Sequence, residues 1–114
     1  MLNKLLGSIN KERVLVYLAA RGRGHSREIA RFFKGPLSPV QKALDNLEAA
    51  AVLVSRMVGT TREYEFNPRY PARAELASLI DRALSLYPPK LRNQLLVTRS
   101  RPRRRGKPLR NLMA

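Results

Sequence analysis

Apolar residues recur at helical spacing over the first part of the chain and predict two helices. The first is short and lies between Leu2 and Ile9. The second covers Lys11–Ala20, with Asn10 at the position of an N-cap. The segment Arg21–Gly24 then ends the second helix, because its two glycines interrupt the helical pattern.

Two further helices, separated by a tight turn, are predicted after these glycines. Ser26 is a suitable N-cap for the first of them, and Gly35-Pro36 ends it. The next helix is expected over Ser38–Ala50. Its first residue is the expected N-cap, Pro39 suits the first helical position, and Gln41 completes a capping box.

The pattern then changes to a hairpin followed by one more helix. Residues alternate in Val52–Phe66 on both sides of the turn signal Gly59-Thr60, which predicts two strands. Ala72–Tyr87 has the clearest helical periodicity of the chain, and Pro88-Pro89 ends it. This order predicts a mostly helical α+β fold: a winged helix-turn-helix with an additional C-terminal helix.

Basic charge is concentrated towards the C-terminal end. The net charge is +15, and Pro88–Ala114 holds nine Lys and Arg residues and no acid. We therefore predict a winged-helix domain with flanking dimerisation helices over residues 1–87 and a basic tail over 88–114. Within the tail, Lys90–Thr98 has the composition of one short element, and the part beyond Arg99 is expected to be disordered when free. A polyanionic partner is favoured, whereas the tail lacks the apolar stripe of a membrane-surface helix.

Two strings in this region resemble bacterial and archaeal regulators of the MarR-like and ArsR-like superfamily. Val40–Leu53 resembles their recognition helix and the strand that follows it, and Tyr64–Pro68 resembles the end of their wing. The resemblance covers roughly Asn10–Leu84 and implies a DNA-binding transcriptional regulator. The chain departs from the family at Ala51, where a glycine often follows the recognition helix, so the C-cap geometry is an open point.

The helix over Ser38–Ala50 is the one expected to enter the major groove. The residues expected to face the groove are those left exposed near its start once the apolar stripe is removed: Ser38, Pro39, Gln41, Lys42 and Asn46. Gln and Asn pair with adenine edges, Lys42 reaches a guanine or a phosphate, and Ser38 suits a phosphate at the helix N-terminus. In the alternative, Ser38 and Gln41 only cap the helix, and Lys42 and Asn46 form an ordinary solvated face.

The wing and the preceding helix supply candidate backbone contacts. An Arg beside small hydroxyls at a hairpin tip is suited to the DNA backbone or the minor groove. Arg residues on the second helix of the motif are suited to clamping phosphates, with a surface ion pair to an acid such as Glu28 as the alternative. These candidates are Arg56, Thr60, Thr61 and Arg62 in the wing, and Arg27 and Arg31 on the helix.

The tail contains a string that resembles an AT-hook, which lies in the minor groove of A·T-rich DNA. The string consists of Arg103, Arg104, Arg105, Gly106, Lys107 and Pro108, and Lys107 stands where the usual core has Arg. Non-specific phosphate binding is the simpler interpretation of so basic a segment. In either case the tail is expected to make DNA affinity depend steeply on salt.

The last predicted helix carries more apolar surface than a small winged helix needs. A homodimer is therefore expected, formed with the help of the N-terminal helix. The stripe on the last helix consists of Leu76, Leu79, Ile80, Ala83 and Leu84.

These features predict a sequence-specific DNA-binding transcriptional regulator that is cytoplasmic, since the apolar start of the chain is too short for an export signal or a membrane span. The alternative is a sequence-tolerant nucleic-acid binder of architectural, replication-associated or RNA-binding type; a protein-interaction module is a third. We expect no enzyme activity, cofactor or metal, because there is no Cys and the single His, His25, is more typical of a surface or capping residue than of a base.

Overall fold

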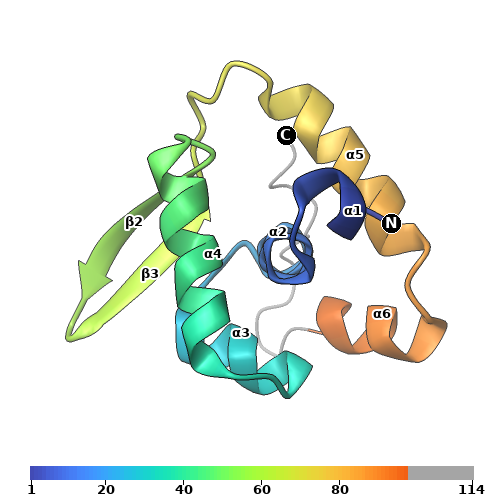
Figure 1. Ribbon diagram of the computed structural model, residues 1–114, viewed down its shortest axis with the longest axis horizontal. Helices are drawn as coiled ribbons and strands as arrows, with labels where there is room; N and C mark the ends of the chain where they lie inside the picture. The colour runs from blue at the N-terminus through green and yellow to red at the C-terminus, as the bar shows by residue number, and fades with distance from the viewer. Residues whose placement is uncertain (98–114) are drawn as a thin grey trace.

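The computed structural model describes residues 1–97. Helices and a small sheet succeed one another along this part of the chain. Their order is α1 (Asn3–Leu6), α2 (Ile9–Arg21), β1 (Arg23–Gly24), α3 (Ser26–Phe33), α4 (Leu37–Ala49), β2 (Leu53–Val58), β3 (Thr61–Phe66), α5 (Arg73–Ser85) and α6 (Pro89–Leu96). The predicted α+β fold, with its winged-helix order of elements, is confirmed (Figure 1).

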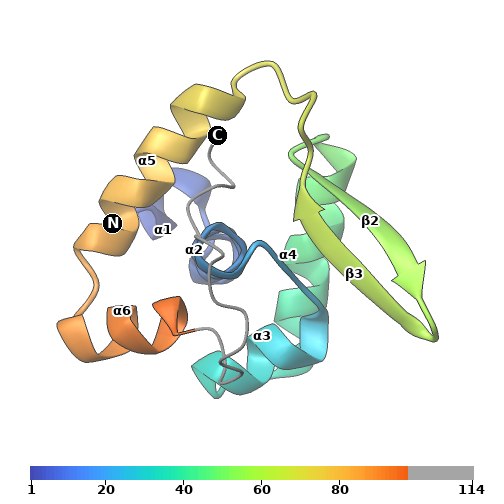
Figure 2. The same cartoon turned by 180° about the vertical axis from the view of Figure 1, so that it is seen from behind.

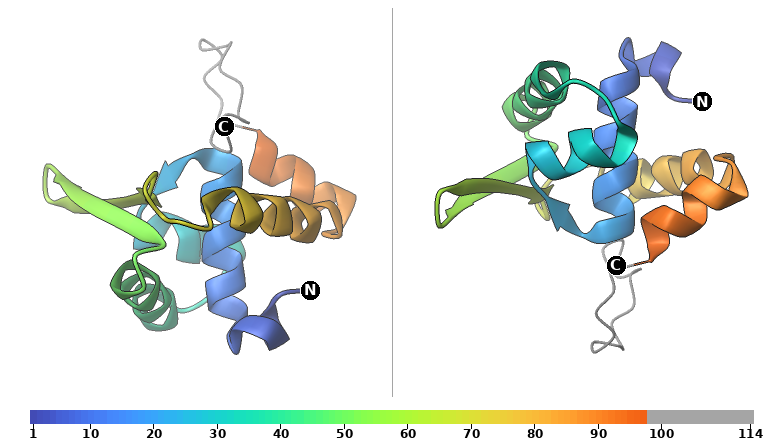
Figure 3. Two further views of the ribbon diagram at one scale, coloured as in Figure 1. Left: turned by 90° about the horizontal axis from the view of Figure 1, so that it is seen from above. Right: turned by 90° about the horizontal axis from the view of Figure 1, so that it is seen from below.

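Helix α2 lies at the centre of the molecule, with the other helices arranged around it (Figures 1 and 2). Its residues Val14–Ala20 are all buried, because neighbouring helices cover it on every side. The hairpin β2–β3 projects from this body on the side opposite to α5 and α6 (Figure 3). This arrangement leaves the hairpin free to contact a partner beside α4.

The N-termini of α2 and α3 are capped by residues one or two positions before those expected. Ser8, not Asn10, caps α2, and its Oγ accepts a backbone N–H of the first turn at 3.1 Å. His25, not Ser26, caps α3. Its Nδ1 accepts the Glu28 backbone N–H at 3.3 Å, and the Glu28 carboxylate accepts the His25 N–H at 3.1 Å. An imidazole nitrogen thus replaces the usual hydroxyl in a capping box.

The expected capping box of Ser38 and Gln41 at the start of α4 is wrong. Pro36 is extended, with φ −70° and ψ 150°, and Leu37 is already the first helical residue. Ser38 and Pro39 therefore lie inside the first turn, and no side-chain hydrogen bond caps this end. Pro39 is tolerated there because N–H groups of the first turn have no partner within a helix.

Helix α4 ends in a Schellman motif built on an alanine. Ala51 has a left-handed φ of 67°. Its N–H donates to Glu48 O at 2.9 Å, and the N–H of Val52 donates to Leu47 O at 3.0 Å. Ala51 thus adopts the left-handed C-cap conformation without being a glycine, and the chain enters β2 directly.

The hairpin forms as predicted. Strands β2 and β3 pair antiparallel with Val58 opposite Thr61, so the turn consists of the two residues Gly59 and Thr60. Gly59 has φ 66°, which a glycine adopts without steric cost.

A third strand was not predicted. Arg23–Gly24 forms β1 and pairs with β3, giving the strand order β1-β3-β2. These residues were interpreted only as a helix stop. Gly24 in fact allows close packing, because a Cβ there would lie 2.8 Å from Cε1 of Tyr17.

Much of the apolar stripe on α5 packs inside the chain. Ile80 and Ala83 are completely buried, so these two cannot contact a twin subunit as expected. Leu76, Leu79 and Leu84 are half-buried and pack against the same core. Part of the stripe that suggested a dimer is therefore explained by packing on α2.

Helix α6 belongs to the folded domain, which extends past the expected boundary at Tyr87. Leu95 is completely buried. The guanidinium of Arg21 donates to Leu95 O at 2.8 Å through Nε and to Gln94 O at 3.0 Å through Nη2. Arg21 thus satisfies carbonyls at the end of α6 and ties it to α2. The remaining tail candidates, Arg103, Arg104, Arg105 and Lys107, lie outside the described residues.

Candidate nucleic-acid interface

One face of α4 is open to solvent along its length. The opposite face carries buried apolar residues and holds the helix on the core. The open face includes four of the residues predicted for DNA contact and one acid that the sequence analysis did not select. The exposed residues are Ser38, Gln41, Lys42, Asp45 and Asn46. Pro39 is half-buried beside them.

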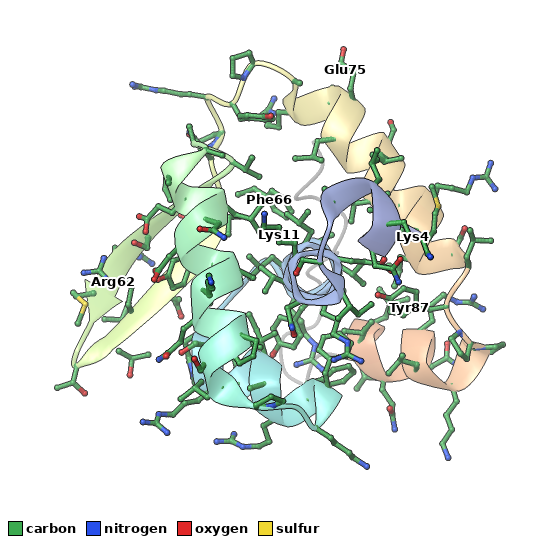
Figure 4. The ribbon with its side chains drawn as sticks, viewed as in Figure 1. Lys4, Lys11, Arg62, Phe66, Glu75 and Tyr87 are labelled. Atoms are coloured by element: carbon green, nitrogen blue, oxygen red, sulfur yellow. The ribbon has the colours of Figure 1, made fainter. Side chains whose placement is uncertain are left out.

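The wing presents Arg62 towards α4. Strand pairing places Ser55 opposite Tyr64 and Arg62 two residues before Tyr64, so all three share one face of the hairpin. The Arg62 guanidinium donates to Ser55 Oγ at 2.9 Å, and this hydroxyl donates to Glu48 Oε2 at 2.6 Å. The bonds link the wing to α4 and hold Arg62 at the edge of the open face (Figure 4).

The other wing arginine, Arg56, lies on the opposite face of the hairpin. It stands opposite Glu63 in the strand register, and their side chains lie 3.8 Å apart. Arg23 of β1 joins this group at 3.8 Å from Glu63 and 3.9 Å from Glu65. The structure therefore separates Arg56 from Arg62, although the sequence analysis grouped them.

Helix α3, which packs against α4, contributes two exposed arginines. Arg27 and Arg31 lie one turn apart, and neither forms an ion pair within the described part of the chain. The alternative partner, Glu28, is instead engaged with the backbone and ring of His25. Both guanidiniums therefore remain available to an anion.

A cleft of about 500 Å³ lies between the start of α3, the open face of α4 and the wing. It brings together five predicted residues and four that were not selected. The predicted ones are Arg27, Gln41, Thr60, Thr61 and Arg62, and the additional ones are His25, Ser26, Asp45 and Tyr64. Ser38, Pro39, Lys42, Asn46, Arg31 and Arg56 lie outside it.

Two of the additional residues carried a signal in the sequence. Asp45 follows Gln41 by one helical turn and so shares its face. Tyr64 alternates with Arg62 along a strand and so shares its side of the hairpin. His25 was expected to be a surface or capping residue, and its hydrogen bond with the Glu28 backbone N–H shows that it caps α3.

Tyr64 is a buried phenol beside two carboxylates. Burial raises the pKa of Tyr64, and the negative charges of Asp45 and Glu48 raise it further, whereas Arg62 opposes them. The hydroxyl is consequently protonated at neutral pH and acts as a hydrogen-bond donor at the floor of the cleft.

Comparison with known proteins gives no family to which the chain can be assigned: no family model, curated protein or solved structure matches it. The resemblance to MarR-like and ArsR-like regulators thus remains a prediction.

Within residues 1–97, no helix has the length and apolar character needed to cross a membrane. The same residues contain no cluster of three or more His, Asp or Glu side chains suited to a metal ion.

Proposed function

We propose that this protein is a cytoplasmic, sequence-specific DNA-binding transcriptional regulator that inserts α4 into the major groove. The observation that carries the proposal is the open polar face of α4, part of which shares a cleft with cationic side chains of two neighbouring elements. Arg62 flanks it from the wing, and Arg27 flanks it from α3. A major groove about 12 Å wide admits one helix and is bordered by phosphates on both sides.

The residues at the centre of this face are suited to base edges. Gln41 and Asn46 present amides that pair bidentately with adenine, and Lys42 presents a donor for guanine. Ser38 lies in the first turn of α4, where free backbone N–H groups favour a phosphate. The proposed base readers are therefore few, and Gln41 shares a cleft with the proposed backbone-binding groups Arg27 and Arg62.

The flanking groups are suited to setting the register on the duplex. Arg27 and Arg31 extend from α3, and Thr60, Thr61 and Arg62 surround the wing tip. Contacts of this kind fix orientation without reading sequence. The segment after α6 adds charge towards the same partner, with seven Lys and Arg residues in Val97–Ala114.

A homodimer forms part of the proposal. Because Ile80 and Ala83 are buried within the chain, the interface would use the exposed apolar residues near α1. Met1, Leu5 and Ile9 are 53%, 71% and 39% exposed. Light scattering on the purified protein tests the dimer. The Leu5→Glu variant should run as a monomer, and an unchanged mass of the dimer would place the interface elsewhere.

The function is tested by selecting bound duplexes from a random library, followed by gel shifts at ~150 mM salt. A regulator should enrich one motif, with half-sites about one helical turn apart for a dimer, and prefer it over random DNA by at least ~10³-fold. The double variant Lys42→Ala, Asn46→Ala should lose that preference. The matched variant Lys90→Ala, Asn93→Ala on exposed α6 positions should keep it.

The second candidate is a sequence-tolerant nucleic-acid binder, which the net charge of +15 favours. It predicts tight binding without an enriched motif. Duplex RNA or single strands should then displace a bound DNA probe as effectively as duplex DNA does. The same selection therefore separates the two functions. Failure to bind duplex DNA even at low salt would exclude both DNA-binding proposals.

A further inference from the structure

An exposed carboxylate stands in the middle of the face proposed to meet DNA. Asp45 lies one turn after Gln41 and beside Asn46 on α4. It lines the cleft together with Arg62, yet no cation pairs with it in the described part of the chain. The negative charge is therefore not neutralised within the fold.

Asp45 also has a buried neighbour. Tyr64, which is 6% exposed, lines the same cleft from β3. The charge of Asp45 contributes to the raised pKa of Tyr64, so the two side chains lie close together. The carboxylate of Asp45 is therefore positioned at the cleft, where a binding partner would meet it.

A carboxylate at this position works against non-specific DNA binding. DNA presents phosphates along both groove edges, and bringing a like charge into the groove is unfavourable. The cost is recovered only where the DNA offers a hydrogen-bond donor. In the major groove, the 4-amino group of cytosine is the donor that Asp characteristically accepts from.

We propose that Asp45 is a specificity-determining residue of α4, which accepts a hydrogen bond from the 4-amino group of a cytosine in the major groove. At sites that lack this amine, the same carboxylate weakens binding by repulsion. The inference rests on the proposed DNA-binding function and adds a base identity to it. Asp45 thereby offsets the sequence-independent attraction that Arg27, Arg62 and the tail provide.

The test compares Asp45→Asn with Asp81→Asn. Both changes remove one exposed carboxylate and keep the side-chain shape, but Asp81 lies on α5, away from the cleft. Library selection with the wild-type protein should yield a motif containing a C·G pair. Asp45→Asn should lose the preference at that pair, which corresponds to about a 5- to 150-fold loss of discrimination for a contact of ~1–3 kcal/mol. Asp81→Asn should leave the motif unchanged.

A chemical substitution in the DNA isolates the contact. Replacing the selected cytosine by 2-pyrimidinone removes only the 4-amino group. This replacement should weaken binding by the wild-type protein and by Asp81→Asn, and it should have no further effect on Asp45→Asn. Circular dichroism checks that the variants are folded before binding is compared.

The possible failures are distinct. If the wild-type protein selects no motif, the proposed regulator function fails. If it selects one and Asp45→Asn keeps the full preference, the inference about Asp45 is overturned while the function stands. A uniform loss of affinity in Asp45→Asn for all sequences would also overturn it, because it would show that Asp45 only positions Arg62 or the wing.

Discussion

The hydroxyl of Tyr87 donates a hydrogen bond of 2.9 Å to Oε2 of Glu12, a residue only 2% exposed in the middle of the fold. The other carboxylate oxygen lies 3.5 Å from the amino group of Met1. The buried charge on α2 is therefore held by the segment between α5 and α6, where Tyr87 is labelled in Figure 4, and by the start of the chain. Since a buried carboxylate is costly without partners, this contact ties three segments together.

We expect Tyr87→Phe to destabilise the protein by about 1–3 kcal/mol, because it leaves a buried acceptor with one partner fewer. Urea unfolding followed by circular dichroism measures the change. Tyr70→Phe is the matched control, since the Tyr70 ring packs on the core without a hydroxyl hydrogen bond in the described region. Equal stability of the two variants would show that the Glu12 contact contributes nothing.

The same contact predicts a loss of stability at alkaline pH. Burial, the hydrogen bond to Glu12 and the charge of Glu12 raise the pKa of Tyr87 above its ordinary value of 10.0. The folded state therefore binds this proton more tightly than the unfolded state. The resulting stability is fully present below pH 10 and is lost as the pH rises towards the folded pKa. Unfolding free energies measured across this range should fall more steeply for the wild type than for Tyr87→Phe.

Ala51 in its left-handed conformation predicts a stabilising substitution. Ala51→Gly should raise the free energy of unfolding by about 1 kcal/mol, because glycine adopts this φ without the Cβ clash. Ala49→Gly, placed at the last residue of α4, should instead lower it by about 0.5–1 kcal/mol. Denaturant titrations compare the two variants. A destabilised Ala51→Gly protein would mean that the Schellman motif is absent in solution.

The elements of this fold were predictable where periodicity alone decides them. Val40 and Leu44 mark the buried side of α4, and Glu63–Phe66 alternates as a strand, so local spacing was sufficient. Strand β1 was not predictable in this way, because Arg23–Gly24 becomes a strand only by pairing with β3. Such a pairing depends on tertiary structure and leaves no local pattern.

The candidate interface was predictable where helical spacing alone places a residue on the open face of α4. Helical spacing identified Lys42 and Asn46 on the open face. Asp45 has the same spacing but was not among the predicted contacts. The separation of Arg56 from Arg62 needed the strand register, since it depends on which side of the hairpin faces α4. Helix α6 joins the domain through the burial of Leu95 and through the bonds that Arg21 makes to the last turn of the helix, and neither feature is visible in local spacing.

The two wing arginines should differ in their contribution to DNA binding. Arg62→Ala should weaken binding to all sequences and reduce the slope of log affinity against log salt by about 1, as expected for one lost phosphate contact. Arg56→Ala should change the slope much less, because its guanidinium faces away from α4 and lies 3.8 Å from Glu63. Gel shifts at several salt concentrations measure both slopes. Equal effects would show that DNA contacts both sides of the wing.

Removal of Arg99–Ala114 separates affinity from sequence reading. The segment contributes basic charge and no acid, so its deletion should flatten the salt dependence of DNA binding. The selected motif should not change, because the proposed base contacts all lie on α4. Fluorescence anisotropy on the selected duplex and on random DNA, at several salt concentrations, measures both quantities. An unchanged salt slope would mean that the tail does not touch DNA. A changed motif would mean that the tail reads bases, which would favour the AT-hook interpretation over simple phosphate binding.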